Sequence, residues 1–334
     1  MLKQVLIIQT ASLGDVILST ALAESLHNLY PDLQLDYLIK NGYQGLFAGH
    51  PFIRKVYTFD KSKGKYRNLF QLISEFRKTG YDAVINVQRF ASSGLITALS
   101  GAPHRCGFDK NPFSFAFNHK CRHIISHKSP AGHEITRNFG LISWIQGIGQ
   151  AKPVLYPDPQ NAGSDIKELF NNQYITISPS SLWFTKQYPA EKWIEFIQAL
   201  PSGIRVVLLG GKDDRELCET IRTRSGTRNM KVLAGELNFL MSAHVMKGAV
   251  MNFVNDSAPM HLASSVNAPV TAVFCSTVPE FGFGPLSDNA SVVETRHSLS
   301  CRPCGLHGHR QCPEKHFSCA LSIERKQLLD RLDL

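Results

Sequence analysis

Short apolar runs alternate with helical patterns along nearly the whole chain, and this alternation is the feature that most constrains the fold. Residues 5–8 form one such run, and apolar residues then recur at helical spacing from Val16 to Leu29. Residues 81–88 form a second run after another helical segment. A buried parallel strand followed by a helix is the repeating unit of doubly wound sheets, so the pattern predicts an α/β fold.

A break in the pattern divides the chain. Residues 150–163 contain three prolines and a glycine, which interrupt periodic structure, and we place a domain boundary there at residue 160. Beyond it the alternation restarts, with predicted strands at residues 174–178, 205–211, 250–256 and 269–274 and predicted helices at 193–200 and 215–222. The sequence thus predicts two α/β domains, 1–160 and 161–334, with a cleft between them.

The composition narrows the class of protein. No apolar run is long enough to span a bilayer, and the N-terminus lacks the basic segment and apolar core of a signal peptide. We therefore expect a cytoplasmic protein whose 8 cysteines are thiols or metal ligands rather than disulfides.

Charge is distributed unevenly between the halves. Residues 1–160 carry 18 Lys and Arg against 10 Asp and Glu, a net of +8, which leaves 18 against 17, a net of +1, for residues 161–334. The runs at 61–67 and 120–128 are especially basic. They indicate an anionic partner, such as a phosphorylated glycolipid, a membrane surface or nucleic acid, although a solvated surface explains any single run equally well.

An acidic residue stands where phosphates usually bind. Residues 12–15 form the predicted turn between the first strand and the first helix, and the last of them is Asp15. A helix N-terminus attracts anions, so Asp15 would repel a phosphate there. Two roles explain an aspartate at this position: Asp15 caps the helix, or it acts as a catalytic base.

The second half offers three further junctions between a strand and a helix. Asp256 and Ser257 precede a predicted helix that contains His261. Two explanations are equally good: the residues cap this helix, or the free N–H groups of the turn bind a diphosphate. Lys186 follows the strand at 174–178, and Asp214 follows two glycines, where a carboxylate contacts a ribose or caps a helix. Neither half contains the glycine-rich loop of a dinucleotide-binding protein or of a Walker A nucleotide-binding protein.

Five segments in order carry a resemblance to a known family. They read IIQTASLGDVILSTAL, SLWFTKQYPAEKW, LLGGKDD, NDSAPMHLA and CRPCGLHGHRQCPEKHFSC. The chain resembles the ADP-heptose:lipopolysaccharide heptosyltransferases of glycosyltransferase family nine over essentially its full length. The resemblance implies the GT-B fold, in which two Rossmann-like domains face each other across a cleft.

The same resemblance implies a reaction and its residues. It implies inverting, metal-independent transfer of heptose from ADP-heptose to the inner core of lipopolysaccharide, with no cofactor. The base falls on Asp15, and the donor-binding residues fall on Lys186, Asp214, Asp256, Ser257 and His261. Ala258 replaces a glycine that is usual in the family, which questions the backbone geometry at the donor phosphates.

The resemblance also gives the basic half a partner. It assigns that half to the anionic lipid A and inner core, with a peripheral position on the cytoplasmic face of the inner membrane. The candidate acceptor-binding residues are Arg89, Arg105, Lys110, Lys120 and Arg122.

The C-terminal segment concentrates cysteines in the pattern C-x2-C-x7-C-x6-C. Cys301, Cys304, Cys312 and Cys319 can hold a structural zinc or iron ion, and the alternatives are reduced thiols or an oxidised crosslink. A zinc-containing nucleic-acid-binding protein would explain the charge and the cysteines. It leaves Asp15, Lys186 and the segment from Asp256 to His261 unexplained, so we expect no nucleic acid. The other alternative is a glycosyltransferase of the same fold that uses a different nucleotide sugar as donor.

Overall fold

The fold was examined in a computed structural model that describes residues 2–60, 64–127 and 132–332. The chain divides into two compact units, residues 1–156 and 157–334. The boundary lies at Tyr156, whereas the proline pattern placed it at residue 160, which here belongs to a short 3-10 helix (Pro159–Asn161). Among the described residues no helix is long and apolar enough to cross a membrane.

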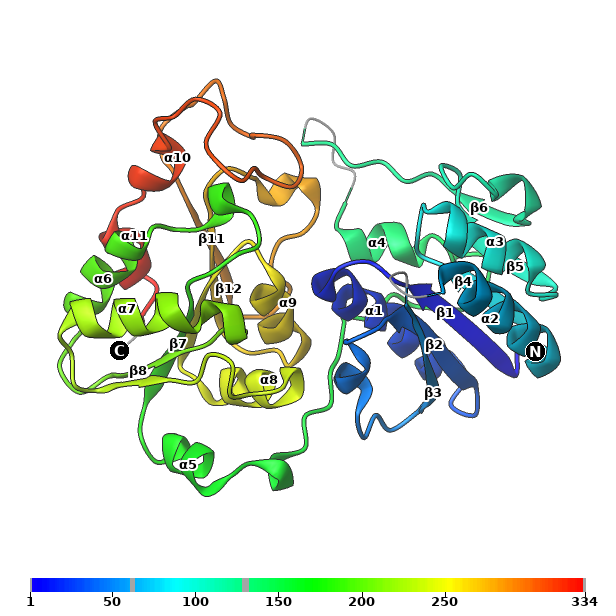
Figure 1. The fold of residues 1–334 in the computed structure, drawn as a ribbon, viewed down its shortest axis with the longest axis horizontal. Coiled ribbons are helices and arrows are strands. Elements are labelled where there is room, and N and C mark those ends of the chain that lie inside the picture. Colours follow the sequence, from blue (N-terminus) through cyan, green and yellow to red (C-terminus); the bar gives the residue numbers. More distant parts are fainter. Residues whose placement is uncertain (1, 61–63, 128–131, 333–334) are drawn as a thin grey trace. The chain divides into compact units, whose positions relative to one another are not determined.

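The first unit is built on one parallel sheet. Its strands are β1 (Gln4–Gln9), β2 (Gln34–Lys40), β3 (Ile53–Phe59), β4 (Ala83–Asn86), β5 (His104–Phe108) and β6 (His119–Cys121), in the order β3-β2-β1-β4-β5-β6. The helices are α1 (Leu13–Leu29), α2 (Lys65–Thr79), α3 (Ala91–Leu99) and α4 (Glu134–Phe139). Helix α1 packs with α4 and α2 with α3, and Figure 1 shows α1 and α2 on opposite sides of the strands.

The second unit repeats this plan. Its strands are β7 (Tyr174–Ser178), β8 (Arg205–Leu208), β9 (Met230–Val232), β10 (Met251–Asn255), β11 (Val270–Phe274) and β12 (Ala290–Glu294), in the order β12-β11-β10-β7-β8-β9. The helices are α5 (Ser164–Lys167), α6 (Ala190–Gln198), α7 (Arg215–Ser225), α8 (Phe239–Gly248), α9 (Ala258–Ser265), α10 (Ser318–Leu321) and α11 (Arg325–Leu329). The two units therefore share one strand order (Figure 1).

Each sheet starts at a central strand and grows first to one side and then to the other. The direction reverses between β1 and β4 in the first unit and between β7 and β10 in the second. Ligands of open parallel sheets bind outside the strand carboxyl ends at this reversal, because the flanking loops diverge there. The reversal points therefore locate one candidate binding edge in each unit.

The packing explains why the strands read as continuous apolar runs. Residues 5–8 and 83–85 are enclosed by helices on both faces of the first sheet, and Trp193 and Phe196 of α6 pack on the second. The spacing of the apolar residues in α1 suggests a helix with one apolar stripe, and the structure differs from this. Helix α1 is buried on nearly all sides, from Val16 to Leu26, as expected for a helix in the interior of a unit.

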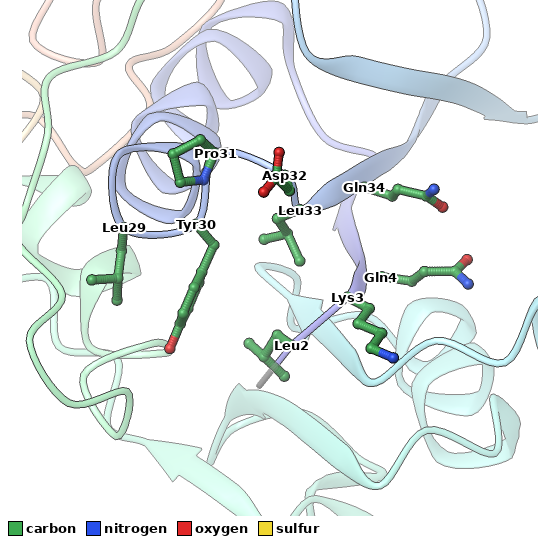
Figure 2. A pocket seen from close by; sticks show the side chains of 9 residues that line it. All are labelled: Leu2, Lys3, Gln4, Leu29, Tyr30, Pro31, Asp32, Leu33 and Gln34. Carbon is green, nitrogen blue, oxygen red and sulfur yellow. The ribbon is translucent and has the colours of Figure 1, made fainter.

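A pocket of about 370 Å³ lies in the first unit, and Figure 2 shows the side chains that line it. Its lining residues are Leu2, Lys3, Gln4, Leu29, Tyr30, Pro31, Asp32, Leu33 and Gln34. They precede β1 and β2 or begin them, so this pocket lies at the amino ends of the strands. It is therefore at the opposite edge of the sheet from the candidate binding edge, which lies at the carboxyl ends of β1 and β4.

The last residues of the first unit are tied to α1. The Val154 N–H donates to Thr20 Oγ1 at 3.1 Å, and Tyr156 Oη donates to both carboxylate oxygens of Glu24 at 3.1 Å. Burial raises the pKa of Glu24 to about 7, although the Tyr156 hydrogen bond acts in the opposite direction. Glu24 thus takes up a proton more readily in the folded chain than in the unfolded chain.

We expect the contribution of Glu24 to the stability of the protein to fall as the pH rises from 5 to 8, because Glu24 ionises while buried. A folded pKa above the unfolded value means that folding binds a proton between about pH 4.5 and 7, and this contribution is lost above pH 7. Glu24→Gln should therefore be about 1 kcal/mol more stable relative to wild type at pH 8 than at pH 5, allowing for solvent screening. Thermal unfolding at both pH values measures this, with exposed Glu168→Gln as control. An equal difference at both pH values would contradict it.

Candidate active site

A lysine and an aspartate from two loops form an ion pair at the carboxyl edge of the second sheet. Lys186 ends a 3-10 turn (Phe184–Lys186) after β7, and Asp256 follows β10 directly. Lys186 Nζ lies 2.7 Å from Asp256 Oδ2, with 15% and 8% of the two side chains exposed. The sequence assigned both residues to donor binding but did not predict that they contact each other.

The loop after β11 adds a third residue to this pair. Thr277 Oγ1 donates to Asp256 Oδ2 at 2.6 Å, so the same carboxylate oxygen binds both Lys186 and Thr277. Two donors on one oxygen fix the direction of the carboxylate, and a lysine ammonium keeps further N–H donors when one of them is bound to Asp256. The arrangement holds a partly exposed cation at the reversal between β7 and β10.

Helix α9 begins beside the pair. Its N-cap, Ser257, makes no side-chain capping bond, and its hydroxyl donates instead to the Asn255 carbonyl at 3.4 Å. His261 is the fourth residue of α9, in its first turn as predicted, and its side chain is buried. Ala258, the first residue of α9, has no positive φ, so this position does not need the glycine that is usual there.

The C-terminal cysteine-rich segment holds the loop that carries Lys186. Thr185 exchanges two hydrogen bonds with His309, one from the Thr185 N–H to the His309 carbonyl at 3.1 Å and one from the His309 N–H to Thr185 Oγ1 at 2.8 Å. A Cβ on Gly308 would lie 3.2 Å from Lys186 Cγ, so a side chain there would crowd the lysine.

The same segment also holds the loop that carries Thr277. Arg302 donates from Nε to the Cys275 carbonyl and from Nη2 to the Thr277 carbonyl, both at 2.8 Å. The Cys304 N–H donates to the Ser276 carbonyl at 2.8 Å. Sequence reasoning missed Arg302 and Thr277, because nothing in their local pattern indicates a contact between segments so far apart in the chain.

Asp214 occupies a capping position. Its Oδ2 accepts the Gly211 N–H at 2.7 Å and closes a short 3-10 turn (Lys212–Asp214) after β8. A Cβ on Gly210 would lie 2.7 Å from Asp214 Cβ, which explains a glycine at that position. The structure thus shows the capping alternative, and a ribose contact of Asp214 stays a prediction.

Asp15 also takes part in a cap. Helix α1 begins at Leu13, so Asp15 lies in its first turn and not in the preceding loop as the sequence suggested. Ser12 donates to Asp15 Oδ2 from its hydroxyl at 2.6 Å and from its backbone N–H at 3.1 Å, and it accepts the Asp15 N–H at 3.4 Å. This capping box fixes the carboxylate at the carboxyl end of β1.

The basic acceptor candidates separate into two groups. Arg89, Lys110 and Arg122 are exposed and follow the carboxyl ends of β4, β5 and β6, and exposed Lys120 lies within β6. Arg105 lies near the amino end of β5. Its guanidinium donates to the Ala116 carbonyl at 2.8 Å and to the Ala102 carbonyl at 2.6 Å, so it holds neighbouring loops together. The side chains of Lys61, Lys63, Lys65 and Lys128, from the basic runs, lie outside the described residues.

The model of glycosyltransferase family 9 (heptosyltransferase) matches residues 69–317, which is most of the chain. The chain belongs to this family. The predicted family, the GT-B fold and the predicted glycosyltransferase class of enzyme are thereby confirmed.

Individual relatives of this glycosyltransferase agree with the family match. Lipopolysaccharide heptosyltransferase 3 of Escherichia coli is 26% identical over 291 residues, which are 83% of this chain and 84% of that protein. The structure of E. coli ADP-heptose lipopolysaccharide heptosyltransferase II has a TM-score of 0.78 at 20% identity, covering 99% of this chain and 97% of that one. The iron-containing dodecameric glycosyltransferase TibC of E. coli has a TM-score of 0.58 at 16% identity, covering 99% and 75%.

The cysteines of this glycosyltransferase are free thiols in the structure. Burial, with the charges of neighbouring thiols added, raises the pKa of Cys304 and raises that of Cys319 to about 11. Cys301 Sγ lies 3.9 Å from His316 Nε2. Within the ranges that the structure describes, no three or more metal-binding side chains stand together, so the thiols as arranged here do not form the predicted metal site.

The pair of Lys186 and Asp256 predicts a coupled stability effect. Lys186→Met leaves the Asp256 carboxylate partly buried without its cation and should destabilise the protein by about 2 kcal/mol. The double variant that combines Lys186→Met with Asp256→Asn should lose less stability than the two single variants added together. Its loss in free energy of unfolding should be smaller than that sum by at least about 1 kcal/mol. Urea unfolding measures the cycle, and Lys231→Met, from an exposed pair with Asp165, should cost less than about 1 kcal/mol. Additive effects at Lys186 and Asp256 would show that the pair does not couple.

Proposed function

We propose that this family 9 glycosyltransferase transfers heptose from ADP-heptose to a hydroxyl of the lipopolysaccharide inner core, with inversion at the anomeric carbon. The names of the relatives supply the donor and the acceptor. The observation that carries the proposal is the pair of Lys186 and Asp256 beside the start of α9, because it offers a fixed cation and a helix N–H group at one place.

The donor diphosphate would bind at the reversal point of the second sheet. Lys186 binds Asp256 with one N–H and keeps others for a phosphate oxygen. In the first turn of α9, Pro259 has no N–H and the Met260 N–H donates to the Ser257 carbonyl at 3.0 Å, so the Ala258 N–H would be the helix group that meets the diphosphate. His261, in the same turn, would donate to the diphosphate. These groups stabilise the negative charge that grows on ADP as it leaves, a role in which removal of one donor often costs about 3 kcal/mol of transition-state stabilisation.

Asp15 would act as the general base. Its carboxylate has more acceptor sites than the Ser12 bonds occupy, so it can cap α1 and accept the proton of a sugar hydroxyl. In the reaction Asp15 takes that proton, the hydroxyl oxygen forms the bond to the anomeric carbon, and the bond to ADP breaks with its electron pair. We propose that this step needs no metal ion or other cofactor, because Lys186 and α9 supply the positive charge.

The exposed basic residues Arg89, Lys110, Lys120 and Arg122 would contact the anionic acceptor and the membrane surface that carries it. We do not include Arg105, because its guanidinium is bound to two backbone carbonyls near the other edge of the sheet. A position at the cytoplasmic face of the inner membrane belongs to this proposal. A different nucleotide sugar as donor is the alternative that donor profiling separates.

Two variants separate the base from the cap at Asp15. Asp15→Asn keeps an acceptor for Ser12 but cannot take a proton, so acceptor-dependent release of ADP from ADP-heptose should fall at least about 100-fold. Ser12→Ala removes the hydroxyl partner but keeps the carboxylate, so turnover should change less than about tenfold while stability falls by about 1 kcal/mol. Near-normal turnover of Asp15→Asn would leave Asp15 as a cap only. Absent turnover in wild type would refute the donor or the acceptor.

We also propose that Cys301, Cys304, Cys312 and Cys319 hold a structural zinc or iron ion once their side chains turn toward one another. The C-x2-C pair formed by Cys301 and Cys304 and the iron content of TibC support this. Elemental analysis of reduced protein should find about one metal ion per chain, and Cys312→Ser should lose both that metal and several degrees of melting temperature. Metal-free wild type of unchanged stability after addition of zinc or iron would refute it.

A further inference from the structure

Three buried polar atoms without partners lie at the reversal point of the first sheet. Thr10 follows β1, Asn86 ends β4, and Gln88 lies two residues beyond. Within the described ranges, Thr10 Oγ1, Asn86 Nδ2 and Gln88 Oε1 have no hydrogen-bond partner. A buried polar atom left unpaired costs about 1–3 kcal/mol, so three together at one place need an explanation.

The surrounding hydrogen bonds hold two of these side chains, Asn86 and Gln88, in position. Gln88 Nε2 donates to Gln9 Oε1, which also accepts the Ala11 N–H at 3.2 Å. The Gln88 N–H donates to Asn86 Oδ1 at 2.9 Å. The Gln88 carbonyl accepts Asn111 Nδ2 at 3.0 Å. The network therefore orients the unpaired atoms of Asn86 and Gln88, and Thr10 lies next to Gln9 in the chain.

The network is directly connected to the residues that precede α1, the helix that carries the candidate base. Ala11, which donates to Gln9, precedes Ser12, and Ser12 is the residue that binds the Asp15 carboxylate. Thr10 and Gln88 retain 3% and 5% exposure as whole residues, although their unpaired oxygens are buried, whereas Asn86 is fully enclosed. Thr10 and Gln88 are thus the two residues that a bound molecule could contact after a small side-chain rotation.

The chemistry of the unpaired atoms selects a class of ligand. A hydroxyl donates and accepts, and an amide oxygen only accepts. None of these three groups carries charge, and an amide oxygen repels a phosphate oxygen, so the set fits neutral hydroxyl groups better than an anion. Phe90, 53% exposed at the start of α3, adds an apolar ring next to this edge. Several convergent polar groups beside an aromatic ring are typical of a small-molecule site.

We propose that Thr10 and Gln88 form a subsite for the uncharged hydroxyls of the acceptor sugar, with Asn86 and Gln9 as positioning residues. This inference rests on the proposed function for the identity of the ligand as an acceptor. The exposed basic residues bind the anionic groups of the acceptor, and this subsite orients the sugar ring beside Asp15. Rotation of the Gln88 amide releases the hydrogen bond from its Nε2 to Gln9 Oε1 and gives the Gln88 oxygen a hydroxyl donor, and Thr10 Oγ1 pairs with a second hydroxyl.

The test is direct binding of an inner-core oligosaccharide from which acyl chains and phosphates have been removed, measured by calorimetry without donor. Thr10→Val, which has nearly the same shape, should lower affinity at least fivefold. Its melting temperature should stay equal or rise, because a buried unpaired hydroxyl is lost. Thr10→Ser keeps the hydroxyl and should retain affinity. Gln88→Met should also lower affinity at least fivefold.

A matched control is Thr97→Val, since Thr97 Oγ1 is buried in the same unit but donates to the Ser93 carbonyl at 2.8 Å. It should leave affinity unchanged. In all four variants, the dissociation constant for ADP should stay within twofold of wild type. Unchanged sugar affinity in both Thr10→Val and Gln88→Met would overturn the subsite. Absent turnover with intact, Thr10-dependent sugar binding would instead refute the proposed transfer and leave the subsite standing.

Discussion

All strands of a parallel sheet end at the same edge, and the candidate chemistry of this protein depends on that constraint. In the second unit, loops after β7, β10 and β11 supply Lys186, Asp256 and Thr277, which are distant in sequence but meet within hydrogen-bond distance. In the first unit the same geometry places Asp15, Thr10 and Gln88 after β1 and β4. Helices on both faces bury the strands, so the loops at this edge remain available for ligands.

Both candidate carboxylates bind a neighbour within the protein before any substrate enters. Asp15 accepts two hydrogen bonds from Ser12, and Asp256 accepts Lys186 and Thr277 on one oxygen. A side chain fixed in this way loses little further conformational freedom when it meets a ligand, which is the physical advantage of a preorganised site. The geometry at Asp15 is therefore compatible with both capping and catalysis. Whether Asp15 is a base as well as a cap depends on whether it takes a proton in the reaction.

The cysteine-rich segment acquires a role that does not require a metal. Arg302 and His309 hold the loops of Thr277 and Thr185 through backbone and side-chain hydrogen bonds, so the segment supports the pair of Lys186 and Asp256 from behind. A metal bound by the four cysteines would stiffen this support. The sequence indicated only a metal site in this segment because its cysteine spacing is a local pattern, whereas His309 and Thr185 are 124 positions apart and Arg302 and Thr277 are 25 apart.

The sequence by itself determined the alternation of strands and helices, because apolar runs and helical spacing are local consequences of burial on a parallel sheet. β7 matches its predicted range, and α6, α7, β10 and β11 lie close to theirs. It also determined the family, since five segments in order are specific. Tertiary structure alone decided that Lys186 pairs with Asp256, that Arg105 binds backbone carbonyls, and that Thr10 and Gln88 keep unpaired polar atoms. Such contacts depend on which strands become neighbours and on the direction of each side chain, and neither is encoded in the spacing of residues along one segment.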